Sequence, residues 1–164
     1  MSYPFRGVLC IVFLCLSMIA CEKDDTTINN PIDDVAMHYE SIELEITDLV
    51  NNYRAQNGLP KLNVLNLVSK EAETHSIYML NCGAISHDNF DERTRNLIEQ
   101  IDALSVGENV AFGYKSAQSL LKGWLNSPTH RRVIEGKSYT DFGIAAEKNS
   151  NGSYYVTQIF IERE

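Results

Sequence analysis

The sequence has too few cysteines to form a disulfide inside a folded domain. Three of its four cysteines, Cys10, Cys15 and Cys21, lie in or directly after an N-terminal apolar run, and only Cys82 lies further along the chain. The hydrophobic core must therefore hold the fold without covalent help. A single cysteine of this kind is most often a small apolar residue of the interior, so we expect Cys82 to be buried.

The sequence also lacks a cluster of basic residues. It has 14 lysines and arginines against 22 acidic residues, which gives a formal net charge of -8. A protein that tracks a phosphate backbone needs lysine and arginine gathered on one surface, so nucleic-acid binding is excluded. The 164 residues allow one domain with a modest core. The sequence contains no internal repeats, and we expect a monomer.

The one long apolar run of the sequence lies near its start. Residues 8–20 follow the positively charged Arg6 and form a run too short to span a membrane comfortably. This pattern predicts a secretory signal peptide over residues 1–20. Its end, Ala20 followed by Cys21, resembles the lipobox of bacterial lipoproteins, in which the cysteine carries the lipid and becomes the mature N-terminus. The alternative is an ordinary signal peptide that ends near a cysteine.

A polar segment separates this signal from the rest of the chain. Residues 21–37 are rich in Asp, Asn and Thr and predict a linker, which leaves residues 38–164 for the folded domain. The acidic residues after Cys21 resemble an export signal that sends some bacterial lipoproteins to the cell surface, and the alternative is a solvated tether. We therefore expect a lipid-anchored protein of the bacterial cell envelope, at the outer membrane or the cell surface.

The first two thirds of this domain show mainly helical periodicity. Apolar residues recur every three or four positions, and Asn57-Gly58 and Cys82-Gly83 supply two helix ends. Ser116 is a good N-cap for a later helix, and Pro128 closes that helix and precedes a short helical turn. The pattern predicts helices over residues 38–56, 66–81, 91–101 and 116–127, with the short turn reaching residue 134.

Strand signals dominate the end of the chain. Residues 106–112 and 141–147 alternate apolar and polar side chains, residues 154–161 are almost continuously apolar or aromatic, and residues 149–152 form a hairpin loop. Early helices and late strands favour an α+β layered domain. Glu108 lies on the same side of its strand as the apolar residues, and a charge that faces a core needs a partner.

Two further side chains are interpreted as structural. His75 lies on or beside the apolar face of the helix over residues 66–81, and a hydrogen-bonded core histidine is the more common explanation for such a residue than a functional one. Trp124, the only tryptophan, is assigned to the core rather than to ligand stacking.

Three chemically active side chains lie outside the periodic apolar faces. His87 and His130 lie in turn-like segments, and Glu108 follows a glycine at the start of a strand. Metal sites and acid–base sites are built when such residues converge in the fold. We predict that His87, Glu108 and His130 line one cleft.

These features together resemble the CAP superfamily, which includes cysteine-rich secretory proteins, insect venom antigens and plant pathogenesis-related proteins of group one. The resemblance covers about residues 44–160, and the Ser-Pro-x-His step is typical of the bacterial branch. The matching pieces are Asn52-Tyr53-Arg54, Ser86-His87, Gly107-Glu108-Asn109, Trp124, Ser127-Pro128-Thr129-His130, Phe142-Gly143-Ile144 and the strand over residues 155–160.

The resemblance implies a three-layer α-β-α sandwich with a cleft that holds two histidines and two acidic residues. His87, Glu108 and His130 match three of these four, but no carboxylate follows Trp124 where the second acidic residue is expected. Further polar residues in the matching motifs are expected to support the cleft. These are Ser127, Asn109 and Gln158.

Three functions remain open on the sequence. The first is an envelope-anchored binding module whose cleft takes a lipid, glycan or peptide. The second is a hydrolase in the cell envelope, because two histidines and a glutamate suffice to hold Zn²⁺ with an open position for an activated water. The third is a surface interaction domain with a vestigial cleft. Of these we favour the binding module, so we do not expect an enzyme.

Overall fold

The computed structural model describes Met1 and residues 35–164. The predicted signal peptide, Cys21 and most of the linker lie outside the described residues. Within the described part, no helix has the length and apolar character needed to cross a membrane. The elements in chain order are α1 (Ser41–Gln56), β1 (Asn63–Val64), α2 (Asn66–Cys82), α3 (Phe90–Ile101), β2 (Ser105–Tyr114), α4 (Ala117–Asn126), α5 (Pro128–Ile134), β3 (Asp141–Lys148) and β4 (Tyr154–Glu162).

Local sequence signals explain where these helices begin and end. Glu40 and Glu43 form a capping box at the start of α1, in which the Glu40 N–H donates to Glu43 Oε2 over 2.7 Å. Ser116 caps α4 by accepting the N–H of Ser119. Gly83 ends α2 in the left-handed conformation, with φ at 65°, which glycine adopts without steric cost. Pro128 occupies the first turn of α5, where its missing N–H is not needed.

The strands form one four-stranded sheet in the order β1-β3-β4-β2. The central strand β4 pairs antiparallel with both β3 and β2, whereas the short β1 pairs parallel with β3. Strand β2 therefore lies at an edge of the sheet. The sequence did not reveal β1, because two residues are too few to show a strand period.

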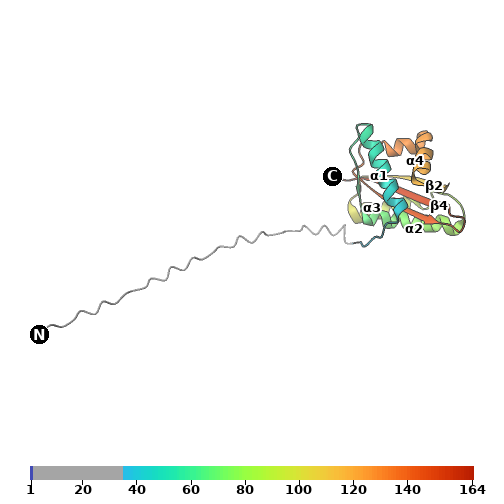
Figure 1. Cartoon of the computed structure of the whole chain (residues 1–164). Coiled ribbons are helices and arrows are strands. Elements are labelled where there is room, and N and C mark those ends of the chain that lie inside the picture. Colours follow the sequence, from blue (N-terminus) through green and yellow to red (C-terminus); the bar gives the residue numbers. More distant parts are fainter. Residues whose placement is uncertain (2–34) are drawn as a thin grey trace.

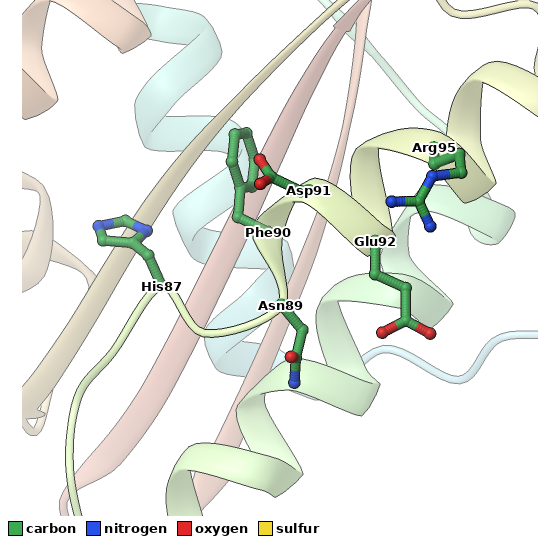
Figure 2. Close-up of a pocket in the computed structure, with 6 residues that line it drawn as sticks. All are labelled: His87, Asn89, Phe90, Asp91, Glu92 and Arg95. Carbon is green, nitrogen blue, oxygen red and sulfur yellow. The ribbon is translucent and has the colours of Figure 1, made fainter.

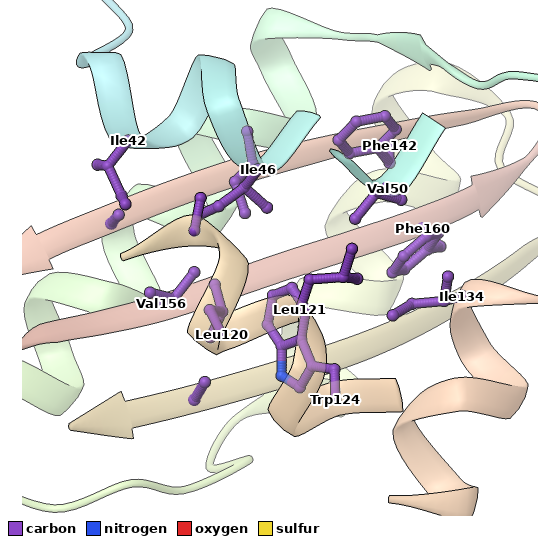
Figure 3. Close-up of a cluster of buried hydrophobic side chains, with 14 of the residues drawn as sticks. Ile42, Ile46, Val50, Leu120, Leu121, Trp124, Ile134, Phe142, Val156 and Phe160 are labelled. Carbon is purple, nitrogen blue, oxygen red and sulfur yellow. The ribbon is translucent and has the colours of Figure 1, made fainter. Parts of the chain in front are cut away.

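Helices cover both faces of this sheet (Figure 1). Helices α1, α4 and α5 pack on one face, where their apolar side chains meet those of β3 and β4 in the larger core cluster (Figure 3). Helices α2 and α3 pack on the other face in a second cluster. The predicted three-layer α-β-α sandwich is confirmed.

Three predictions about single side chains can be compared with the structure. Trp124 is 1% exposed and His75 is 2% exposed, so both belong to the interior, as predicted. The Trp124 indole Nε1–H donates to the carbonyl of Val110 in β2 over 3.2 Å. The prediction for Cys82 is wrong, because this residue is exposed. The buried side of α2 ends at Met79, and Cys82 is the last residue of the helix.

The backbone of β3 approaches that of α2 closely at Gly143. A Cβ atom at this position would overlap the backbone of Val68 and Ser69. We expect Gly143→Ala to lower the free energy of unfolding by about 3 kcal/mol, because backbone on both sides must move to make room. Urea unfolding measures this change.

Gly58→Ala is the matched control for this substitution. Gly58 has a positive φ of 70°, and no atom lies within 4 Å of the added methyl group. Backbone strain alone should cost about 1 kcal/mol there. Equal losses at the two positions would contradict the tight packing of α2 against β3.

Candidate functional site

The site is built around a buried carboxylate on the edge strand. Glu108 in β2 is 8% exposed and faces the layer of α2 and α3. Arg93 from α3 donates to it through two guanidinium nitrogens, Nε to Oε2 and Nη2 to Oε1, each over 2.9 Å. The side chains of Arg93 and Glu108 are almost fully buried, at 7% and 2% exposure. Such a fork-on-fork pair fixes both side chains more firmly than a single ion pair does.

His87 extends this pair to the protein surface. Its Nδ1 lies 2.8 Å from Glu108 Oε1, and its side chain is 53% exposed. An ionised carboxylate can only accept hydrogen bonds, so Nδ1 carries the hydrogen. The other ring nitrogen, Nε2, is then left as the group that His87 offers to a ligand.

Neighbouring residues hold the loop that carries His87. The buried His75 in α2 donates from Nε2 to the carbonyl of Ser86 over 2.8 Å. Arg93 donates from Nη1 to the carbonyl of Asp88 over 2.7 Å. The loop residues on either side of His87 are therefore tied to the two helices that flank them.

His130 approaches the same strand from the other layer. It lies half-buried in α5, and its carbonyl accepts a hydrogen bond from Asn109 Nδ2 over 3.1 Å. Burial lowers the pKa of its imidazole, and the neighbouring His87 lowers that pKa further. The structure joins His87 and Glu108 by a hydrogen bond, and it joins His130 to the strand through Asn109.

The predicted supporting residues differ in what they do. Asn109 and Gln158 are cross-strand partners on β2 and β4, and both are fully buried. Both polar atoms of the Gln158 amide and the Oδ1 atom of Asn109 have no hydrogen-bond partner among the described residues. Ser127 lies at the junction of α4 and α5, where its side chain makes no capping bond.

A cavity of about 410 Å³ opens beside His87. Figure 2 shows its lining at the start of α3, with the His87 ring on one side. The lining is mostly polar apart from one aromatic ring. It consists of His87, Asn89, Phe90, Asp91, Glu92 and Arg95.

The arrangement does not fit a zinc ion. No group of three or more His, Cys, Asp or Glu side chains in residues 35–164 is placed to hold a metal. Both carboxylate oxygens of Glu108 accept bonds from Arg93, and Oε1 also accepts from His87. Whether the protein binds zinc in solution stays a prediction from the sequence.

The sequence analysis missed Arg93, although a signal for it was present. Glu108 required a partner because its strand buries it, and α3 has an arginine on its apolar side. Arg93, Leu97 and Ile101 recur every four residues and are the buried positions of this helix. An arginine in such a series is a candidate partner for a buried carboxylate.

Fold and site together describe an α-β-α sandwich protein with a histidine–carboxylate site at a sheet edge. The sequence model of the cysteine-rich secretory protein family, named CAP, matches residues 47–160. The chain belongs to this family.

Known proteins similar to this chain come from several bacteria. "Uncharacterized membrane protein YlbC" of Bacillus subtilis (strain 168) is 32% identical over 124 residues, which cover 74% of this chain and 34% of that protein. An extracellular protein containing an SCP domain from Bacillus anthracis str. Ames is 27% identical, with a TM-score of 0.66, over 74% of this chain and 40% of that one. The chain thus spans well under half the length of both proteins.

A more distant solved structure shares the fold. An outer surface protein from Borrelia burgdorferi is 19% identical, with a TM-score of 0.66, and the match covers 79% of this chain and 100% of that chain. At this identity the likeness shows the fold alone.

The buried His75 predicts a pH dependence of stability. Burial lowers the pKa of its imidazole in the folded protein, whereas the unfolded chain should titrate near the ordinary value of about 6.5. Below that pH the unfolded state takes up a proton that folded His75 resists, so acidification should cost stability. Unfolding free energies measured at pH 7.5 and 5.5 should therefore differ less for His75→Gln than for the wild type.

The comparison between variants is needed because other groups titrate too. His130 acts in the same direction, whereas burial raises the pKa of Glu43, which acts in the opposite direction. His38→Gln removes an exposed imidazole and should leave the pH dependence as it is. An unchanged dependence in His75→Gln would mean that His75 is not held neutral in the interior.

Proposed function

We propose that this CAP-domain protein is a binding module tethered to the bacterial cell envelope by a lipid on Cys21. Its binding site is the cavity beside His87, a residue that Glu108 holds in position, and its ligand is a component of the envelope. The proposal involves no reaction and no metal.

The observation that carries this proposal is an exposed imidazole fixed by buried charges. An exposed histidine contributes little to folding, yet the His87 ring is held by a carboxylate that is itself held by a buried arginine. Burying a charge pair is costly unless its geometry is good. A rigid scaffold behind one exposed polar group is the arrangement that recognition sites use to reduce the entropy lost on binding.

The cavity beside His87 favours a polar ligand. Its wall combines the Phe90 ring with amide, carboxylate and guanidinium side chains. Such a wall offers many hydrogen-bond donors and acceptors and little apolar area for an acyl chain. A glycan or a polar peptide of the envelope therefore suits the cavity better than the tail of a lipid.

The location is supported by the relatives and by the start of the chain. One similar protein is named extracellular and another is named a membrane protein. The sequence Ala20-Cys21 after an apolar run adds the attachment point for a lipid.

A ligand panel tests the binding site. Full-length protein is titrated with soluble peptidoglycan fragments, with polar peptides and with phospholipid vesicles. His87→Ala should weaken glycan or peptide binding about fivefold, since one hydrogen bond to a ligand contributes about 1 kcal/mol. His38→Ala, which removes an exposed imidazole that is not part of the cavity lining, should bind as the wild type does. Equal affinity of His87→Ala and wild type, or binding to vesicles alone, would show that this cavity is not the binding site.

Cell fractionation tests the anchor separately. Cys21→Ser should move the protein from the membrane fraction to the soluble fraction, because no residue remains to accept the lipid. Cys82→Ser changes an exposed thiol in the folded domain and should leave the protein in the membrane fraction. Retention of Cys21→Ser in the membrane fraction would show that the protein is held there by something else.

A further inference from the structure

We propose that Arg93 takes the place of a metal ion at this site. Its guanidinium supplies, from within the chain, the positive charge against Glu108 that a zinc ion would supply in a site of histidines and carboxylates. Arg93 is therefore a positioning residue for His87, and the site is complete without a metal.

Three hydrogen bonds already occupy the oxygens of Glu108. Oε1 accepts hydrogen bonds from Arg93 Nη2 and from His87 Nδ1, which uses both of its lone pairs. Oε2 accepts from Arg93 Nε and is buried with the rest of the side chain. A metal could bind this carboxylate only at the remaining lone pair of the buried Oε2, beside the Arg93 guanidinium, or after one of these bonds breaks.

The charge of Arg93 also disfavours a metal ion at Glu108. A guanidinium stays protonated at any physiological pH, so Arg93 places a permanent positive charge in contact with the carboxylate. A divalent cation at the same carboxylate would meet that charge in a poorly hydrated environment, where repulsion is weakly screened. The buried pair thus excludes a cation by the same charge that stabilises Glu108.

Arg93 also fixes the orientation of His87. Arg93 acts on this residue by two routes, through Glu108 to the ring and through the Asp88 carbonyl to the loop backbone. In metal sites, the ring nitrogen of a histidine that does not bind the metal donates a hydrogen bond, and this bond fixes the orientation of the ring. Here the same type of bond, from Nδ1 to a carboxylate, is organised by an arginine, and Nε2 stays free for a ligand.

Zinc titration of the full-length protein tests this proposal. Isothermal calorimetry and melting temperature are measured with and without zinc chloride for five proteins. These are the wild type, Arg93→Met, Arg93→Lys, Glu108→Gln and the double variant Arg93→Met with Glu108→Gln. The wild type should show no zinc binding that depends on Glu108, and its melting temperature should not change. His38→Gln identifies any zinc bound by that exposed imidazole.

The Arg93 variants separate the loss of charge from the loss of geometry. Arg93→Met leaves Glu108 buried without a positive partner, so its melting temperature should fall by several degrees and zinc should restore part of the loss. The double variant should show no restoration. Arg93→Lys keeps the charge, so it should melt between the wild type and Arg93→Met and not respond to zinc.

Two results would overturn the proposal. One is a stoichiometric zinc ion in the wild type that is lost in Glu108→Gln. The other is an Arg93→Lys protein that takes up zinc as strongly as Arg93→Met, because the charge of residue 93 would then not control the site. If Arg93→Met does not fold, Arg93→Gln replaces it, and both results can still be measured.

Discussion

The neutralisation of one buried carboxylate organises the site. Strand β2 places Glu108 against the layer of α2 and α3, where water cannot solvate its charge. Arg93 from α3 neutralises this charge and donates two parallel hydrogen bonds to it. Oε1 of the same carboxylate also accepts the hydrogen bond that holds His87. The position of an exposed imidazole is therefore decided by an electrostatic requirement of the interior.

The edge position of β2 explains why residues from both layers meet there. Successive side chains of a strand point to opposite faces, so Glu108 faces the layer of α2 and α3 while Asn109 faces that of α4 and α5. Because no further strand in residues 35–164 covers β2, the loop with His87 and the helix with His130 can both approach it. In the middle of the sheet, neighbouring strands would separate these two histidines.

Most of the fold could be predicted because its signals are local. Helix periods, the stops at Gly58 and Gly83 and the alternation in β2 and β3 each arise within a dozen residues. The partner of Glu108 was not identified for a different reason. Arg93 is 15 residues away on another element, and only the packing of α3 against the sheet brings it to the carboxylate. Cys82 was wrongly predicted to be buried. The buried side of α2 ends at Met79, and the packing of α2 in the fold, rather than the local sequence, decides where it ends.

By itself, the sequence determined the layered α+β class, the order of the helices and strands, and the fact that Glu108 would need a partner. These follow from hydrophobic periodicity and from the cost of burying a charge, which apply to any fold that the chain adopts. The tertiary structure decided which group became that partner, which nitrogen of His87 is free, and that Asn109, rather than Glu108, links His130 to the strand. Those outcomes depend on distances between elements far apart in the chain, and only the packing of the helices on the sheet sets such distances.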